Sequence, residues 1–485
     1  MPQEQFFDIV GDTKKSEYSE FDASLTVNMF QVNEPDSFYK KALFPTPGLN
    51  LDTGQIFDIG STGEEGRALY LFKNRIYAVV KDTIFVIEGS ITDGNLILSH
   101  SILGTIETES GYVGIAELNN QLIFVDGTGG WVYNEGTGDF ITITDAAFPS
   151  SPTDITVLAN RAIVNDRDTK TSYFSAFGDA LTWTQPGIGN FFDMNVYSDV
   201  VIGYQTINGK MFIFGNTHTE VWYDAGAPSL PYRPQNPTLE IGCAAVGSIA
   251  KAFGFLVWLS RTDRGIGSIV VSDGGLPIPI STDAINREID SYDNVTDATS
   301  FLYRNEIGHI VYVINFTSAD ASWMYDFNTK GWSKLESDDR NRYLANAYIY
   351  YKSRHFVLDY KQPYLYEMSQ KFHDDNGKAI LRMRIFNIDK ITIKIEHYNK
   401  TPFVLLGAEG NITKVNFFKI ILNRIRFYLK QGTGTATGMD ANPVLFISTS
   451  IDGGISYRNK LEAHIGQMGK RVFETDFLNI GGLST

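Results

Sequence analysis

Short runs of apolar, β-branched and aromatic residues, each closed by Gly, Asn or Asp, follow one another along nearly the whole chain. Runs of about four to eight such residues are typical of strands joined by tight turns. The best candidate for a helix is 281–292, where Ile285 and Ile289 share one face and Ser281 or Thr282 can cap the first turn. The pattern therefore predicts an all-β fold with one short helix.

A hairpin-like unit recurs seven times, with an apolar strand, a polar turn and a second, aromatic-rich strand. The units cover 71–89, 117–136, 157–179, 206–226, 251–274, 302–327 and 349–368, and their leading turns lie near Asn74, Asn120, Asn160, Asn208, Phe253, Ile307 and Ser353. Their average spacing of about 46 residues matches one blade of a β-propeller. Blades stack radially until the ring closes, because a single four-stranded blade cannot bury both faces. We therefore predict a propeller rather than ordinary sandwiches, with seven blades, although six or eight stay open.

The repeat pattern also predicts the domain boundaries. Residues 1–60 form an N-terminal segment that completes or braces the propeller, and 61–370 form the propeller itself. The polar segment 371–378 reads as a linker. Longer alternating strands follow in 379–485, which predicts an antiparallel, sandwich-like β-domain.

Composition narrows the class of protein. The chain has 485 residues, of which 43% are hydrophobic, 13% aromatic and 20% charged, with a formal net charge of −15. This acidity argues against binding nucleic acid over the whole surface. A single cysteine, Cys243, excludes an intrachain disulfide and reads as a buried structural thiol. Neither a secretory signal nor a long apolar stretch is visible, so we expect a soluble protein without a membrane anchor.

No motif points to catalysis. The seven histidines show no paired-ligand spacing, and no Gly-x-Ser-x-Gly nucleophile elbow occurs. The loop Gly432–Gly438 is followed by a strand rather than the helix that a phosphate cradle needs. The acids Asp166, Asp168, Asp263, Asp273 and Asp283 fit solvated turns better than a glycosidase pair. We therefore predict no catalytic, cofactor or metal site.

Several residues are predicted to have structural roles. Trp258, Asp263, Arg264 and Gly265 fit a hairpin in which an Asp–Arg pair fixes the turn, and Trp323 and Trp332 should pack as blade aromatics. The segment SIDGGISY (450–457) fits an Asp box, in which Asp452 accepts hydrogen bonds from its own turn and Gly454 permits positive φ.

Charge is distributed unevenly. Residues 378–430 carry a net charge of about +8, which leaves about −23 on the remainder. This excess predicts either a solvated sheet face or a basic face that docks onto an acidic partner or touches DNA phosphates. The candidate docking residues are Arg382, Arg384, Lys390, Lys394, Arg424 and Arg426.

An ordered set of segments resembles one known family. The segments are VNMF (27–30), LFPTPGL (43–49), IGCAAVGS (241–248), VWLSRTDRGIGSIVVSDG (257–274), PISTDAI (279–285), WMYDFNTKGWSKLES (323–337), SIDGGISY (450–457) and IGQMGKRVFE (465–474). Together they resemble the packaged-DNA-stabilisation, or tail accessory, proteins of short-tailed double-stranded DNA phages. The ending TDFLNIGGLST departs from that family's usual closing strand.

The resemblance implies a non-enzymatic structural protein of the virion tail, assembled in the host cytoplasm. It implies a ring of identical copies, a homohexamer, that serves as tail hub or nozzle below the portal and adaptor. Such a ring would close the DNA exit channel, retain packaged DNA and guide its ejection, without sequence-specific contact to the DNA. Tail fibre, needle or tailspike proteins are the further partners implied. An acidic propeller face lining the channel would keep DNA from adhering to the wall.

Two other classes of function stay open at this point. The Asp box and the many aromatics would suit a sialidase-like propeller that binds or cleaves glycans, which would need carboxylates or arginines converging on a central pocket. A generic peptide-binding propeller is the third class, although no WD dipeptide repeats in the chain.

Overall fold

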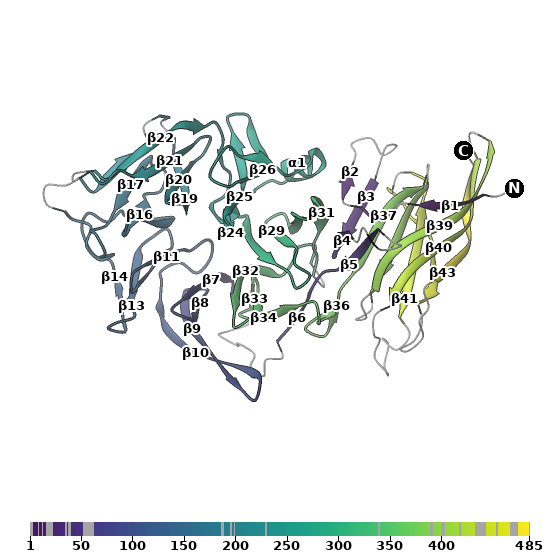
Figure 1. Ribbon diagram of the computed structural model, residues 1–485, viewed down its shortest axis with the longest axis horizontal. Coiled ribbons are helices and arrows are strands. Elements are labelled where there is room, and N and C mark those ends of the chain that lie inside the picture. The colour runs from purple at the N-terminus through teal and green to yellow at the C-terminus, as the bar shows by residue number, and fades with distance from the viewer. Residues whose placement is uncertain are drawn as a thin grey trace.

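The computed structural model describes residues 3–7, 9–11, 13–15, 23–33, 36, 40–51, 63–185, 189–194, 196–197, 199–227, 230–337, 340–388, 391–398, 403–416, 419–431, 443–452, 454–465 and 474–484. Strands dominate these residues, and they form a propeller joined to a β-sandwich (Figure 1). The predicted all-β class is confirmed.

Four antiparallel sheets of four strands form the first four blades of the propeller. Their strands are β7 (Gly66–Phe72), β8 (Arg75–Val80), β9 (Thr83–Thr92), β10 (Asn95–Thr105); β11 (Gly114–Leu118), β12 (Gln121–Val125), β13 (Gly130–Asn134), β14 (Asp139–Thr142); β15 (Ile155–Leu158), β16 (Arg161–Asn165), β17 (Thr171–Phe174), β18 (Phe191–Asp193); and β19 (Val201–Ile207), β20 (Lys210–Gly215), β21 (Thr219–Asp224), β22 (Tyr232–Leu239). Each blade is a meander of consecutive strands, which is what the repeated hairpin units predict.

Three further blades complete the ring, and the last takes a strand from the start of the chain. Their strands are β23 (Gly242–Cys243), β24 (Ala250–Ala252), β25 (Phe255–Thr262), β26 (Gly265–Ser272), β27 (Ile278–Pro279); β28 (Thr299–Arg304), β29 (Ile310–Phe316), β30 (Ala321–Asp326), β31 (Gly331–Lys334); and β32 (Ala345–Tyr351), β33 (Arg354–Asp359), β34 (Leu365–Ser369) with β6 (Gly48–Asn50). Because β6 pairs antiparallel with β34, early and late residues of the chain close the same blade.

Apolar side chains seal the ring at each junction between neighbouring blades. Seven separate clusters of buried residues each join one blade to the next, and one of them joins blade 7 back to blade 1. All six tryptophans are buried in these clusters, namely Trp131, Trp183, Trp222, Trp258, Trp323 and Trp332. The aromatic richness of the sequence therefore serves mainly to fill the space between blades.

The meander topology gives the propeller two different faces. The hairpin face contains the turns between first and second strands, at 73–74, 119–120, 159–160, 208–209, 253–254, 305–308 and 352–353. The connection face contains the turns between second and third strands and the segments that lead from one blade to the next. The hairpin-face turns coincide with the leading turns predicted from the sequence, and six of the seven hold a non-glycine residue at positive φ.

The single helix packs between blades 5 and 6. Helix α1 (Asp283–Asp290) begins after Thr282, whose Oγ1 accepts a hydrogen bond from the Ile285 N–H at 3.4 Å. Ile285 and Ile289 are buried in the cluster that joins these blades. The predicted helix, its cap and its buried face are therefore confirmed.

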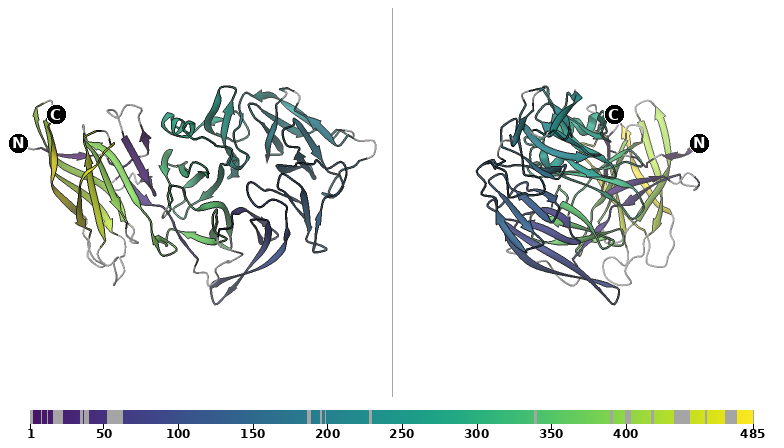
Figure 2. Two further views of the ribbon diagram at one scale, coloured as in Figure 1. Left: turned by 180° about the vertical axis from the view of Figure 1, so that it is seen from behind. Right: turned by 60° about the vertical axis from the view of Figure 1, so that its left-hand side comes forward.

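The N-terminal segment does more than complete blade 7. Its strands β1 (Gln3–Phe7), β2 (Lys14–Lys15), β3 (Ala23–Val27), β4 (Met29–Asn33) and β5 (Lys41–Pro45) lie between the propeller and the sandwich or within the sandwich (Figures 1 and 2). Strand β3 pairs with β31 of blade 6 on one side and with β37 of the sandwich on the other. A single ten-stranded sheet therefore runs from the propeller into the sandwich.

The C-terminal module consists of two sheets packed face to face. Its strands are β37 (Arg382–Ile388), β38 (Ile391–His397), β41 (Val444–Ser450) and β42 (Arg458–His464) in one sheet, and β39 (Phe403–Asn416), β40 (Lys419–Gln431) and β43 (Glu474–Ser484) with β1, β4 and β5 in the other. One apolar cluster fills the space between them. The atypical C-terminal ending forms β43, which pairs along β40. The segment predicted as a linker instead adds a short hairpin, β35 (Asp374–Asp375) and β36 (Lys378–Ala379), to the edge of β6.

Candidate functional site

The tryptophans singled out from the sequence all lie inside blade junctions. Trp258 is fully buried between blades 4 and 5, and its indole N–H donates to the Gly242 carbonyl at 3.2 Å. Trp323 and Trp332 are buried between blades 5 and 6, where their indole groups donate to the Tyr292 hydroxyl and the Ile280 carbonyl. Each buried indole thus keeps a hydrogen-bond partner.

The turn after Trp258 differs from its prediction. Asp263 and Arg264 are both exposed, and no ion pair joins them in this described part of the chain. The Arg264 backbone N–H instead donates to Thr262 Oγ1 at 3.2 Å, and Gly265 takes φ of +122°. The backbone therefore fixes this turn, and the Asp–Arg pair does not.

The Asp box lies in the sandwich, at the turn between β41 and β42. Asp452 accepts hydrogen bonds from the Ser450 hydroxyl at 2.6 Å and from the Ser456 N–H at 2.9 Å. These bonds lower the pKa of the Asp452 carboxyl. Gly454 has φ of +92°, a conformation that side chains rarely adopt. The geometry is that of a self-contained turn, remote from the propeller to which a sialidase-like site would belong.

The two arginines of β37 do not form a docking face, because both are buried. Arg384 donates from Nε to the Ile9 carbonyl at 2.9 Å and from its guanidinium to Thr26 Oγ1 at 2.8 Å. Arg382 donates to the His373 carbonyl, and burial lowers its pKa to about 10, against the opposing effect of Asp375 and Asp374. These side chains hold neighbouring segments in place and are not available to a partner.

Three of the other four predicted docking residues are paired with carboxylates. Arg426 makes a two-point contact with Asp476 and lies 2.9 Å from Glu474, and Arg424 lies 3.5 Å from Glu409. Lys394 lies 2.8 Å from Glu396. Lys390 lies outside the described residues. Arg424, Arg426 and Lys394 therefore each have a carboxylate partner within the sandwich.

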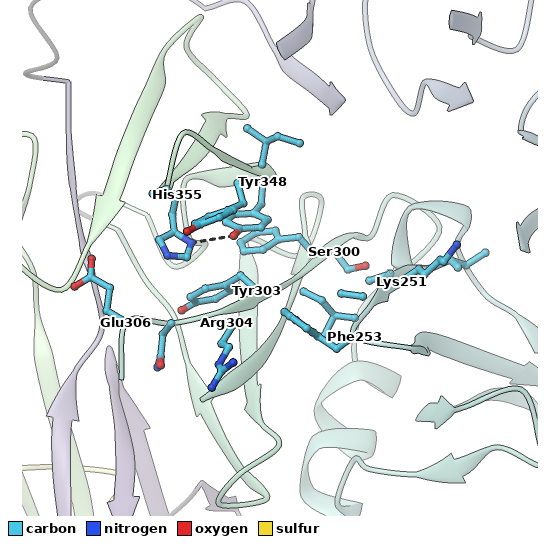
Figure 3. A pocket seen from close by; sticks show the side chains of 17 residues that line it. Lys251, Phe253, Ser300, Tyr303, Arg304, Glu306, Tyr348 and His355 are labelled. Carbon is cyan, nitrogen blue, oxygen red and sulfur yellow. Dashed lines mark hydrogen bonds between the residues drawn. The ribbon is translucent and has the colours of Figure 1, made fainter. Parts of the chain in front are cut away.

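A cavity of about 890 Å³ lies against the first strands of blades 5, 6 and 7, a site that no sequence motif indicated. Strands β24, β28 and β32 and the hairpin turns that follow them form its wall. Figure 3 shows Lys251 at one end of a row of side chains and Glu306 and His355 at the other. Two large aromatic residues in its wall are strongly exposed, namely Phe253 at 52% and Tyr350 at 51%.

Aromatic contacts fix the His355 end of the cavity. The Tyr348 hydroxyl lies 2.9 Å from His355 Nδ1, and the Tyr348 ring stacks on Phe301. Burial lowers the pKa of His355, although Glu306 and Glu367 oppose the shift. The imidazole is therefore held largely neutral near pH 7, and this end is a preformed wall rather than a titrating switch.

Two cations in the cavity have no carboxylate partner among the residues that the structure describes. Lys251 shows neither an ion pair nor a hydrogen bond from its ammonium group, and burial lowers its pKa. Arg304 donates from Nε to the Gly308 carbonyl at 3.3 Å but to no carboxylate. In contrast, Glu306 accepts a hydrogen bond from the Ser369 hydroxyl. The cavity thus combines apolar rings with uncompensated positive charge.

The connection face is markedly acidic. Its exposed acidic residues outnumber its exposed basic ones: Glu107, Glu109, Asp168, Glu240, Asp263, Asp283, Asp290 and Asp293 against Arg167, Arg264, Arg287 and Lys361. Other acids of this face are used within the fold. Asp126 and Asp145, for example, each accept several backbone N–H bonds from loops.

In the described ranges, no three His, Cys, Asp or Glu side chains gather as metal ligands. Within the same residues, no helix has the length and hydropathy that spanning a bilayer requires.

The fold defines this chain as a β-propeller scaffold fused to a β-sandwich. The family described as "Bacteriophage P22 Gp10, beta-propeller" matches residues 5–373. The chain belongs to this family of structural tail proteins of phages, as the sequence resemblance indicated.

The other comparisons carry no argument about function. A search of curated proteins gave no match. Among solved structures, a catalytically inactive virginiamycin B lyase from Staphylococcus aureus has 9% identity and a TM-score of 0.41, over 65% of this chain and 98% of that one. The N-terminal domain of Nup159 has 10% identity and a TM-score of 0.39, over 71% and 98%. A chain of the mitotic checkpoint complex has 11% identity and a TM-score of 0.38, over 73% and 96%.

Proposed function

We propose that this chain is a non-enzymatic subunit of a ring of identical copies in a phage tail, which closes the DNA exit channel and retains packaged DNA. The observation that carries the proposal is the ten-stranded sheet shared by blade 6, β3 and the sandwich. A subunit that transmits load between a DNA-filled particle and its tail needs modules that cannot swing independently. Strand pairing across the junction supplies that rigidity, which a flexible linker would not.

The acidic connection face supports a role beside DNA without adhesion to it. Exposed carboxylates repel a phosphate backbone, so a duplex could slide past such a surface without being held. In the proposed ring, the connection face or its rim faces the channel. Retention of DNA then depends on physical closure of the ring by the tail and not on attraction.

A structural role also accounts for several conspicuous carboxylates. The Asp145 carboxylate accepts hydrogen bonds from the N–H groups of Trp183 and Thr184 across a loop, and these bonds lower its pKa. Asp199 likewise accepts from the N–H groups of Thr217 and His218. Acids committed to backbone groups in this way stabilise the blades.

Docking to the adaptor and portal, a homohexameric copy number, and contact with fibre, needle or tailspike proteins belong to the same proposal. Attraction between a basic C-terminal face and an acidic partner is not part of the proposal, because Arg382 and Arg384 are buried and Arg426 is paired with Asp476. Docking should instead depend mainly on shape and apolar contact. Adaptor binding should therefore change little between low and high salt.

Particles made with and without this chain test the proposal. We expect particles that lack it to lose packaged DNA, and electron microscopy of complemented particles to show a ring of copies below the portal and adaptor. Native mass spectrometry of the purified chain with the portal–adaptor complex gives the copy number. Full DNA retention without the chain would overturn the proposal, as would substrate turnover traced to it.

A further inference from the structure

We propose that the cavity against blades 5, 6 and 7 binds an extended peptide segment of another protein, in which an apolar side chain is flanked by carboxylates. This site is separate from ring closure and DNA retention, so its failure would leave the tail role untouched. Three independent observations lead to it: a strained exposed aromatic, two uncompensated cations, and a preformed aromatic wall.

Phe253 has a backbone conformation that is unfavourable for an aromatic residue. It takes φ of +52° in the first hairpin of blade 5 and is 52% exposed. At the equivalent turn of blade 4, Asn208 takes φ of +50° and is followed by Gly209, as Gly254 follows Phe253. Asn tolerates this left-handed conformation, whereas a bulky aromatic residue does not. A residue that costs stability and exposes apolar surface is expected where something binds to it.

The charges indicate what binds. Lys251 and Arg304 lie along the same cavity as Phe253, and neither has a carboxylate partner in the described residues. Both side chains are exposed to solvent, so a ligand in the cavity can reach their charged groups. Carboxylates from a ligand would supply the missing partners, and strong hydrogen bonds to charged groups would orient the segment.

Other polyanions and sugars fit the cavity less well. Glu306 lies in its wall and repels any anion, so the carboxylates of the ligand have to lie at Lys251 and Arg304, whereas a long run of phosphates would also extend along Glu306. Phe301 and Tyr303 are almost fully buried, so they offer little open ring surface on which sugars could stack. The exposed rings are those of Phe253 and Tyr350, which lie on separate blades and can contact an apolar side chain from two blades. A volume of about 890 Å³ accommodates several residues of an extended chain.

Matched pools of acetylated, amidated pentapeptides test the site on the full-length protein by saturation-transfer NMR. The acidic pool has Asp or Glu on both sides of a central Phe, Tyr, Trp, Leu or Ile. The basic pool replaces the acids with Lys or Arg, and a third pool keeps the acids but has Gly in the centre. We expect transfer to the central side chain in the acidic pool alone. Equal signals from the acidic and basic pools, or none at millimolar concentration, would overturn the proposal.

Variants then locate the binding. Lys251→Ala and Arg304→Ala should each weaken binding of the strongest acidic peptide by about tenfold. Phe253→Asn should weaken it similarly while leaving Tm unchanged or raising it, because it relieves the strained turn. The matched control, Asn208→Phe, should lower Tm and leave peptide binding intact. Unchanged peptide affinity in all three cavity variants would contradict the assignment. The assignment would also be contradicted if a twelve-base-pair DNA duplex or an acidic oligosaccharide bound more tightly than the peptide and the peptide failed to displace it.

Discussion

The side-chain amide of Asn28 and the backbone of Glu336 bind each other twice. Asn28 Nδ2 donates to the Glu336 carbonyl at 2.9 Å, and the Glu336 N–H donates to Asn28 Oδ1 at 3.0 Å. The same amide also donates to the Leu381 carbonyl at 2.8 Å. One buried side chain at the end of β3 therefore joins blade 6 to the first strand of the sandwich.

Replacing this amide should weaken both modules together. Asn28→Ala removes three hydrogen bonds and leaves buried backbone groups unpaired, which costs about 2–4 kcal/mol in the free energy of unfolding. Asn28 also takes φ of +52°, which Ala tolerates poorly. Urea unfolding checks the prediction, with Asn33→Ala as the control because Asn33 is exposed on the next strand. Equal losses in the two variants would show that Asn28 is not a junction residue.

Asp154 should make stability depend on pH. The carboxyl is buried, and it accepts hydrogen bonds from the Tyr204 N–H at 2.7 Å and the Tyr112 hydroxyl at 3.1 Å. The groups that face it are neutral at ordinary pH, including the buried Cys243 thiol, whose pKa burial raises to about 12. Burial raises the pKa of Asp154 to about 7. The unfolded chain releases this proton near pH 4. The contribution of Asp154 to the free energy of unfolding therefore falls as pH rises from about 4 to 7, and it is constant above pH 7.

Asp154→Asn isolates this contribution. The difference in unfolding free energy between the variant and the natural chain should grow in favour of Asn between pH 4 and 7, by on the order of 4 kcal/mol at most. Urea titrations at several pH values measure it. Asp452→Asn should give a difference of opposite pH dependence, since the Asp452 pKa is lowered. A constant difference for Asp154→Asn would contradict the buried, protonated state.

Replacing Arg384 should destabilise the protein much more than replacing Arg426, although both residues belong to the predicted basic docking face. Arg384→Ala removes a buried guanidinium that holds Ile9 and Thr26, so we expect a loss of about 2–4 kcal/mol. It should also speed proteolysis near residues 9–11. Arg426→Ala breaks surface pairs and should cost no more than about 1 kcal/mol. Similar losses and cleavage in the two variants would refute this division.

Trp258 and Arg264 provide a second contrast within one hairpin. Trp258→Ala empties a fully buried site between blades 4 and 5 and should cost about 3–5 kcal/mol. Arg264→Ala changes an exposed turn residue and should stay within about 0.5 kcal/mol. Thermal unfolding measures both changes. A large loss for Arg264→Ala would restore the idea that its charge fixes the turn.

The sequence predicted the blades because their signals are local. Each first hairpin has its own turn chemistry, such as Asn208–Gly209, and the apolar and aromatic residues of the strands fill the blade junctions. The helix was predicted for the same reason, since Thr282 and Ile285 lie within one turn of each other. Interactions between residues that are close in the sequence can be predicted directly from residue order.

The burial of Arg382 and Arg384 could not be predicted from residue order in this way. Alternation along β37 correctly places both on one side of the strand, but it does not show which side is covered. The covering residues, Ile9 and Thr26, lie 375 and 358 positions away from Arg384. The cavity was missed although a signal existed: Phe253 occupies a left-handed turn position where blade 4 uses Asn.

The ten-stranded sheet also determines when the junction between blade 6 and the sandwich can form during synthesis. Asn28 meets Glu336 across 308 positions and Leu381 across 353, so β3, which pairs locally with β2, cannot join blade 6 to the sandwich until most of the chain has left the ribosome. Long-range pairing of this kind forms late and slowly. The junction between blade 6 and the sandwich therefore forms late, because the strands on both sides of β3 are made long after β3 itself.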